Sequence, residues 1–236
     1  MKKLAIFGST GSIGKQSLEV VPHGDFKVVA LSAFSKSELL SEQGSKFGAK
    51  TFLGKLSSEK IHEIISDADY VINAVPGFEG LNVSVQALKA GKVLLSANKE
   101  SLAIAGKYLK QIAKENNAEI RPLDSEAFAT WQLLNKHGFE NLNSVTLTCS
   151  GGPFYGKKIS ELSEVSVEEA LNHPTWKMGP KVSLDSATLI NKVFEVFEIS
   201  NLFDISPSAI NIVIHRQSLV HGIIHTKTGA TKMQIN

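Results

Sequence analysis

The chain has 236 residues, of which 42% are hydrophobic and 20% are charged, and its formal net charge is +2. This is the composition of a soluble globular protein with a sizeable core, and the small net charge argues against a surface built for nucleic acid. No apolar run approaches the roughly 20 residues of a membrane helix, and the short one after Lys2 and Lys3 predicts a strand, not a signal peptide. The single cysteine, Cys149, excludes an internal disulfide and favours a reducing cytoplasm.

Short β-branched runs alternate with amphipathic stretches through the first 120 residues. The expected strands are residues 4–7, 26–34, 51–53, 69–75 and 92–97. A helix is expected after each of them, over residues 15–21, 36–48, 57–68, 81–91 and 100–117. Such alternation predicts an α/β fold, with a Rossmann-like, doubly wound parallel sheet over residues 1–121.

The pattern changes after residue 121. A strand is expected over 144–150, a long helix near 184–200, and a pair of antiparallel strands over 210–215 and 218–226. Residues 122–236 are therefore expected to form a second domain of the α+β class.

The first expected strand runs into a glycine-rich turn, GSTGSIG, at residues 8–14. Its three-residue glycine spacing is a variant of the dinucleotide fingerprint. Glycine lets the backbone approach a pyrophosphate closely, and the start of the following helix offers N–H groups to its charge, with Thr10 and Ser12 as further donors. The alternative is a tight turn that binds no ligand. The position of the glycine-rich turn directly after the first strand of an alternating α/β region favours a nucleotide-binding site.

The end of the second expected strand indicates which nucleotide is bound. An NAD-binding chain usually carries an acid there for the ribose 2′-hydroxyl. This chain instead has Ser35, Lys36 and Ser37. A cation between hydroxyls suits a 2′-phosphate and favours NADP. The alternative is a lysine without a binding role, since lysines are common in exposed loops.

Two acids, Asp124 and Glu126, lie two positions apart before an expected helix. In an extended segment such side chains point to the same side, so both could face one Mg²⁺ or Mn²⁺ ion, which prefers oxygen ligands. Two carboxylates are too few for a metal site. Surface acids, with Ser125 or Asp124 capping the helix, are the alternative.

The helix expected near 184–200 supplies a candidate third ligand, Glu195. Apolar residues cover most of its circumference and leave one narrow polar stripe, which consists of Thr188, Asn191, Lys192 and Glu195. A helix of this kind is largely buried, so the stripe is expected to face a cavity or a partner. An ordinary solvent-exposed pair of Lys192 and Glu195 is the alternative.

Two loops of the second domain have compositions that suit a substrate site. The segment at 172–181 contains Trp176 and a glycine hinge at Gly179, which fits a lid over a substrate, although a packed connecting loop fits equally. Ser150 and the two glycines after it resemble an anion-binding nest, or else a bulged strand end.

Eight segments together resemble the 1-deoxy-D-xylulose 5-phosphate reductoisomerase family. They occur in the family's order and cover nearly the whole chain. Any one of them is weak, whereas eight in register are very specific. The segments are GSTGSIG (8–14), NAVPGFEGL (73–81), LSANKESL (95–102), PLDSEAFA (122–129), SGGPF (150–154), HPTWKMGPK (173–181), SLDSATLINKVFEVFE (183–198) and HRQSLVHGII (215–224).

This resemblance implies a role for each matched residue. NADPH is expected at Thr10, Gly11, Ser12, Ile13, Ser35, Lys36, Ser37, Asn98, Glu100 and Gly179. The divalent metal, Mg²⁺ or Mn²⁺, is expected at Asp124, Glu126 and Glu195, which with Lys99 and His173 form the catalytic set. The sugar phosphate is expected at Lys99, Ser125, Glu126, Ser150, His173, Trp176, Ser186, Asn191, Lys192 and Glu195.

The implied reaction is the conversion of 1-deoxy-D-xylulose 5-phosphate to 2-C-methyl-D-erythritol 4-phosphate, in which a metal-assisted rearrangement precedes reduction by NADPH. The resemblance implies a cytoplasmic enzyme without a nucleic-acid or membrane partner, and a homodimer for full-length members. Those members are longer and end in a helical bundle, so the chain is expected to be a truncated form. A further departure is Arg216, which stands where the family usually has proline.

Two alternative functions follow from the same residues. One is an inactive NADP-binding fragment. The other is a semialdehyde-type NADP dehydrogenase with Cys149 as its nucleophile, which needs a basic partner for the thiol and leaves the three acids unexplained.

Overall fold

The computed structural model describes residues 1–176 and 178–235, and these form two compact units that are divided between Asp124 and Ser125. The division lies a few residues beyond the expected boundary between residues 121 and 122. Within the described residues, none of the helices combines the length and apolar character needed to cross a bilayer.

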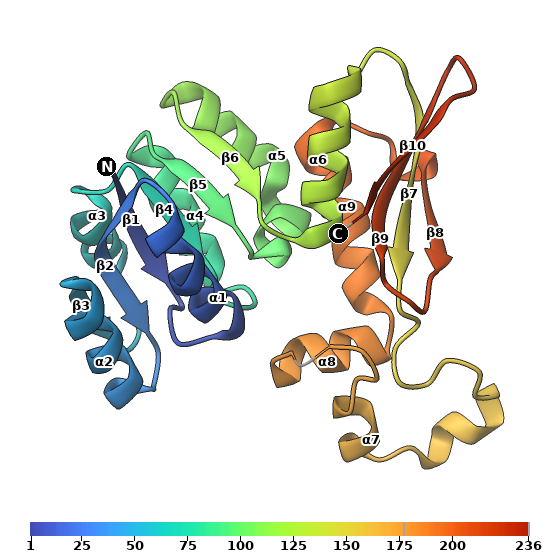
Figure 1. Ribbon diagram of the computed structural model, residues 1–236, viewed down its shortest axis with the longest axis horizontal. Helices are drawn as coiled ribbons and strands as arrows, with labels where there is room; N and C mark the ends of the chain where they lie inside the picture. Colours follow the sequence, from blue (N-terminus) through green and yellow to red (C-terminus); the bar gives the residue numbers. More distant parts are fainter. Residues whose placement is uncertain (177, 236) are drawn as a thin grey trace. The chain divides into compact units, whose positions relative to one another are not determined.

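The first unit is built on a six-stranded parallel sheet in the order β3-β2-β1-β4-β5-β6 (Figure 1). Its strands are β1 (Lys2–Phe7), β2 (Phe26–Ala33), β3 (Lys50–Leu53), β4 (Tyr70–Asn73), β5 (Val93–Ser96) and β6 (Glu119–Pro122). Its helices are α1 (Ser12–Val20), α2 (Ser37–Phe47), α3 (Ser58–Ile65), α4 (Gly80–Lys89) and α5 (Lys99–Glu115), with a short 3-10 turn at Val21–His23. The expected doubly wound α/β fold is confirmed, with β6 as an additional strand.

Both faces of this sheet are buried, which explains why its strands are nearly continuous apolar runs. Leu4 and Ile6 of β1 belong to a core that also contains Leu18 of α1 and Leu40 of α2. The residues between and after them, Ala5 and Phe7, point to the opposite face and are also fully buried. The crossover helices therefore cover both sides of the sheet.

The order of the sheet reverses between β1 and β4, and the glycine turn lies at that point. In open parallel sheets, ligands bind outside the carboxyl ends of the strands where the order reverses. Gly8 ends β1 with φ of +82°, and a side chain there would place its Cβ 2.6 Å from the Ala74 carbonyl oxygen after β4. Only glycine allows the two strand ends to approach so closely.

The second unit is built on a four-stranded mixed sheet in the order β10-β9-β7-β8. Its strands are β7 (Leu142–Cys149), β8 (Ile210–Ile214), β9 (Val220–Thr226) and β10 (Thr231–Ile235). Its helices are α6 (Ser125–His137), α7 (Val167–Leu171), α8 (Pro180–Ala187) and α9 (Ile190–Phe203), with 3-10 turns at Ile159–Glu164 and Pro207–Ala209.

Helices α6 and α9 pack against this sheet, α6 mainly against β9 and α9 against β8. Leu134 of α6, Leu147 of β7, Ile199 of α9 and Ile224 of β9 are each almost completely buried in one core. Each such side chain contributes about 1.5–3 kcal/mol to folding. This core fixes α9, the helix that carries Glu195, against the strand and helix that carry other candidate residues.

Two expectations for the second unit were wrong. Residues 184–200 form two helices, because Leu189 has a left-handed φ of +61° and separates α8 from α9. Thr188 therefore caps α8 and does not share a stripe with Glu195. The last two expected strands do not pair with each other, because β7 lies between them, parallel to β8 and antiparallel to β9.

The strained conformation of Leu189 predicts that its replacement by glycine preserves or increases stability. A left-handed backbone costs a branched residue about 1–2 kcal/mol, which glycine avoids. Leu189→Gly is expected to change the free energy of unfolding by about 0 to +1 kcal/mol. Val193→Gly, at a similarly exposed site inside α9, is expected to lower it by about 1 kcal/mol or more. Urea unfolding measures both, and equal losses would contradict the assignment of strain to Leu189.

Candidate active site

The glycine turn after β1 leaves the start of α1 open to an anion. Gly11 is the N-cap, and among the described residues no side chain caps α1 and no acid lies in its first turn. A Cβ on Gly14 would overlap the Gly8 carbonyl oxygen, so this glycine allows the helix to pack tightly on the turn. Ser12 and Ile13 are exposed at the helix start, whereas Thr10 is buried. Free amide groups and positive dipole charge coincide here, which fits a pyrophosphate.

Asn98 and Glu100 hold the loop that follows β4. The Asn98 amide donates to the carbonyl oxygens of Val75 and Gly77, both at 2.8 Å. The Glu100 carboxylate accepts from the Gly77 amide at 3.1 Å. Both side chains are almost completely buried. Their recorded bonds therefore shape the loop at the carboxyl edge of the sheet, next to the glycine turn.

The residues expected near an adenosine phosphate lie at the start of α2. Ser35, Lys36 and Ser37 are all exposed, and Lys36 is the N-cap of the helix. The exposed ammonium group of Lys36, at the carboxyl end of β2, is accessible to the adenosine phosphate of a cofactor. The hydroxyls of Ser35 and Ser37 are available as further hydrogen-bond donors.

Three carboxylates lie close together around the start of α6. One oxygen each from Asp124, Glu126 and Glu195 lies within 4.8 Å of the other two. Asp124 precedes α6 by one peptide bond, so the chain itself keeps it close to Glu126. The expected extended geometry of this pair was wrong, because α6 begins at Ser125, and Glu126 lies in its first turn. Three carboxylate oxygens from such a cluster are the donors that Mg²⁺ or Mn²⁺ prefers.

Lys192 neutralises two of these acids from inside the second unit. Its ammonium group contacts Glu126 at 2.9 Å, Glu195, and the Thr148 carbonyl oxygen at 2.6 Å. Glu126 and the Thr148 carbonyl accept hydrogen bonds from the ammonium group, and Glu195 forms an ion pair with it. Burial alone would lower the pKa of Lys192, but attraction to the Glu195 and Glu126 carboxylates outweighs it, and the pKa is raised. The polar stripe of α9 is thus buried around an ionic cluster and does not face solvent.

Lys99 neutralises the third acid of the cluster, Asp124. Its ammonium group lies 2.5 Å from Asp124, and both side chains are largely buried. Each acid of the cluster therefore has a lysine partner. Other polar groups also contact these acids, since Ser125 donates to Glu126 at 2.7 Å and Asn191 donates to Glu195 at 2.5 Å.

Ser150 and His173 form a hydrogen-bonded pair at the loop after β7. The His173 Nδ1 atom accepts from the backbone amides of Thr175 and Trp176, at 3.1 and 3.0 Å. The neutral ring must then carry its proton on Nε2, which donates to Ser150 Oγ at 2.9 Å. Ser150 Oγ also accepts from the Gly152 amide at 3.3 Å. The hydroxyl proton of Ser150 is thereby left to donate to a further acceptor.

The remaining candidates surround this loop in the second unit. A Cβ on Gly152 would lie 2.8 Å from the Ser186 carbonyl oxygen, so α8 lies directly against the loop. Trp176 is 46% exposed, and its ring centroid is 6.3 Å from that of His221. Gly179 is the N-cap of α8, and a side chain there would meet open space.

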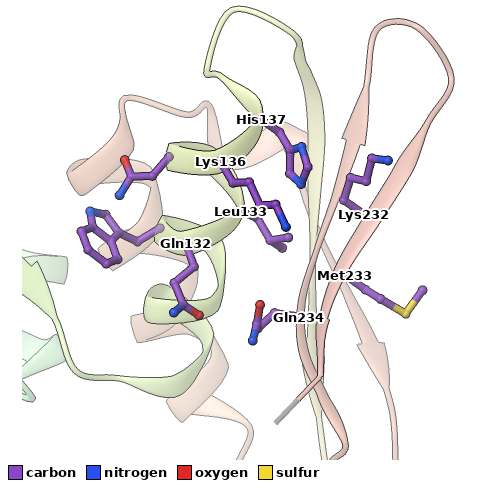
Figure 2. A pocket seen from close by; sticks show the side chains of 9 residues that line it. Gln132, Leu133, Lys136, His137, Lys232, Met233 and Gln234 are labelled. Carbon is purple, nitrogen blue, oxygen red and sulfur yellow. The ribbon is translucent and has the colours of Figure 1, made fainter.

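A groove between α6 and β10 is distinct from this cluster (Figure 2). Figure 2 shows Gln132, Lys136 and His137 of α6 facing Lys232 and Gln234 of β10. Its described lining shares no residue with the candidate site.

Sequence reasoning missed two residues that contribute to this site. The Thr148 carbonyl oxygen binds Lys192, and the Arg216 side chain donates to the backbone of the loop after β7. No residue-type signal marks a backbone carbonyl as a ligand. Arg216 was noticed only as a departure from the family pattern.

The buried cluster predicts a large effect of Lys192→Met on stability. Removal of the ammonium leaves Glu126 and Glu195 buried and uncompensated, which is expected to lower the free energy of unfolding by about 3–5 kcal/mol. Lys181→Met, which breaks a partly exposed pair with Asp185, is expected to lower it by less than about 1 kcal/mol. Urea unfolding measures both variants. A small loss in Lys192→Met would show that the cluster is hydrated and not truly buried.

The geometry of His173 predicts a low titration midpoint. Burial and the nearby Arg216 guanidinium hold the pKa of His173 below its ordinary value of 6.5. Because the folded pKa is lowered, stability from the neutral ring is complete above about pH 6.5 and is lost as pH falls through the folded pKa. The NMR ring signals of His173 report this midpoint directly. A midpoint at or above 6.5 would contradict the burial of the ring and its proximity to the Arg216 guanidinium.

The comparisons with known proteins agree with this arrangement. A profile described as 1-deoxy-D-xylulose 5-phosphate reductoisomerase matches residues 4–61 and 50–106, and a profile of the C-terminal domain of the same family matches residues 120–203. The reductoisomerase of Thermoanaerobacter sp. (strain X514) is 40% identical, and that of Protochlamydia amoebophila (strain UWE25) is also 40% identical. In both cases the match covers 100% of this chain and 67% of the relative.

Solved structures give the same result. A crystal structure of DOX-P reductoisomerase in complex with NADPH, fosmidomycin and magnesium has a TM-score of 0.86 at 33% identity. The Zymomonas mobilis reductoisomerase in complex with NADPH has a TM-score of 0.87 at 28% identity. The matches cover 100% and 99% of this chain and 66% of each relative, so the chain spans about two thirds of their length. The chain belongs to the 1-deoxy-D-xylulose 5-phosphate reductoisomerase family.

Proposed function

We propose that this chain carries the NADPH-dependent conversion of 1-deoxy-D-xylulose 5-phosphate to 2-C-methyl-D-erythritol 4-phosphate, a step of non-mevalonate isoprenoid biosynthesis. The observation that carries the proposal is the convergence of Asp124, Glu126 and Glu195, whose oxygens lie within 4.8 Å of one another. The relatives that share the fold are named for this activity and include complexes with NADPH and magnesium. An NADP-binding fold alone would not need three buried or half-buried acids at one point.

NADPH is assigned to the carboxyl edge of the first sheet. The amides at Ser12 and Ile13 take the pyrophosphate, and Lys36 pairs with the adenosine phosphate. Gly11 contributes by shaping the turn, since its own N–H donates to the Gly8 carbonyl oxygen at 3.0 Å. Asn98 and Glu100 act on the cofactor by holding the loop after β4 in place, since their recorded bonds go to that loop. The cofactor supplies the hydride for the reduction.

A divalent cation is assigned to Asp124, Glu126 and Glu195. When bound, Mg²⁺ or Mn²⁺ supplies Lewis acidity at the ketose carbonyl and the neighbouring hydroxyl. Glu126 and Glu195 both form ion pairs with the Lys192 ammonium group. A buried carboxylate is costly unless a positive charge lies next to it, so a bound cation would have the same stabilising effect on these acids. Lys99 balances Asp124 and offers its remaining donors to the substrate.

The phosphate of the substrate is assigned to the loop after β7 and the helices beside it. Ser150 has a hydroxyl proton to donate, and Ser186 lies on the helix that contacts the loop. Within the described residues, the buried Oδ1 atom of Asn191 has no recorded donor, so it can accept from a sugar hydroxyl. Binding energy gained here, away from the reacting carbons, serves to position them. Trp176, on the loop before α8, closes over the substrate and excludes water.

The alternative of a semialdehyde-type dehydrogenase has little support. Cys149 is a half-buried free thiol, and in the described part of the chain no basic side chain is recorded as a hydrogen-bond partner of its sulfur. Metal-dependent oxidation of NADPH distinguishes the proposed enzyme from the other alternative, an NADP-binding protein without turnover. We further propose a cytoplasmic location, which the lone cysteine favours, and a homodimer for the full-length protein.

The assay follows NADPH oxidation with 1-deoxy-D-xylulose 5-phosphate in the presence and absence of Mn²⁺. Turnover is expected only with the metal. Glu195→Gln keeps the shape of the side chain and removes its charge, so it is expected to lower kcat by at least about a hundredfold while NADPH affinity stays unchanged.

Glu168→Gln, at an exposed position on α7, is the matched control and is expected to keep full turnover. Equal losses of turnover and NADPH affinity in Glu195→Gln would count against its role as a metal ligand. NADPH binding without metal-dependent turnover in the unmodified chain would favour the non-catalytic alternative.

A further inference from the structure

Arg216 ties the turn after β8 to the loop after β7. Its Nη1 atom donates to the Ser150 carbonyl oxygen at 2.9 Å and to the Gly152 carbonyl oxygen at 3.3 Å. The same guanidinium lies over the Tyr155 ring, with its carbon 4.8 Å from the ring centroid. An exposed arginine with this set of contacts is fixed to the loop at both ends of the Ser150–Gly152 segment.

The loop needs such a restraint because of its own sequence. Gly151 and Gly152 both have positive φ, +84° and +68°. Glycine adopts this conformation without strain but loses more conformational freedom than any other residue when it is ordered. Two successive glycines therefore make the loop adaptable and also costly to order around a ligand.

The Arg216 contacts determine the orientation of the Ser150–Gly151 peptide. A trans peptide is planar, so its carbonyl oxygen and the following N–H point in opposite directions. Arg216 binds the Ser150 carbonyl, and the Gly151 N–H is consequently turned away from Arg216. The next restrained carbonyl, that of Gly152, precedes Pro153, which has no N–H. Arg216 thus lies behind the loop, with the Gly151 donor on the other side.

We propose that Arg216 is a positioning residue that holds the Ser150–Gly151 peptide with its N–H toward the phosphate of the substrate. The inference rests on the proposed function, because it takes the loop as the phosphate site. Ser150 contributes the second donor, since its hydroxyl accepts from His173 and Gly152 and keeps its own proton for the anion. Arg216 acts through the loop and does not touch the phosphate.

The test compares Arg216→Ala and Arg216→Lys in the full chain. Loss of two charge-assisted hydrogen bonds in Arg216→Ala is expected to raise KM for the sugar phosphate by about ten- to a hundredfold with little change in kcat. Arg216→Lys keeps the charge but lacks the planar guanidinium that lies over the Tyr155 ring while its Nη1 atom bonds both carbonyls, so its KM is expected to be intermediate. Lys227→Ala, in which an exposed ammonium that bonds the Glu140 carbonyl is removed, is the matched control with an unchanged KM.

A second readout does not depend on turnover. Binding of inorganic phosphate is followed by the NMR ring signals of His173, and the affinity in Arg216→Ala is expected to fall by the same factor as KM rises. This result would support the inference even if the unmodified chain failed to convert the sugar phosphate, which would overturn only the proposed function.

Three outcomes would overturn the inference. One is an unmodified chain whose His173 signals do not respond to phosphate. Another is an Arg216→Ala variant with unchanged phosphate affinity. The third is full rescue by Arg216→Lys, which would mean that charge alone is sufficient and the orientation of the peptide is not set by the guanidinium.

Discussion

The ionic cluster around Lys192 is the interaction on which the second unit depends. The Lys192 side chain is 5% exposed, and its ammonium group contacts two carboxylates and a backbone carbonyl. Burial of any one of these charges alone would cost several kcal/mol, so the members stabilise the fold only as a set. Because the set joins α6, β7 and α9, it also fixes the spacing of the side chains to which the metal is assigned.

This arrangement explains how a chain can keep like charges together before a metal arrives. Asp124 pairs with Lys99, while Glu126 and Glu195 share Lys192. Three acids and two lysines leave one net negative charge, so the cluster attracts a cation without being forced apart by repulsion. The three acids are thus held close together by the ion pairs that they form with Lys99 and Lys192.

The sequence was most informative where periodicity and spacing carry the signal. Alternating apolar runs predicted the first sheet, and the glycines at 8–14 predicted the tight turn after its first strand, because parallel strands and tight turns have strict local requirements. It was least informative at Leu189, where tertiary packing imposes a conformation that leucine disfavours, and at β8 and β9, whose pairing depends on a strand more than 60 residues away from Ile210. The i,i+3 spacing indicated the pair of Lys192 with Glu195, whereas the lysine partners of Asp124 and Glu126 could not be derived from spacing, since those pairs join residues far apart in the sequence.

The central place of β7 has a consequence for the order of events during biosynthesis. It pairs with β8 and β9, which leave the ribosome only after the loop, α8 and α9 have been made. Until then β7 has two open edges and an apolar face, the features that favour association between nascent chains. The first unit has all its strands by Pro122 and can close its sheet while the rest is still being translated. The sheet of the second unit, against which Glu126 and Glu195 are held, is therefore completed only after the first unit can fold.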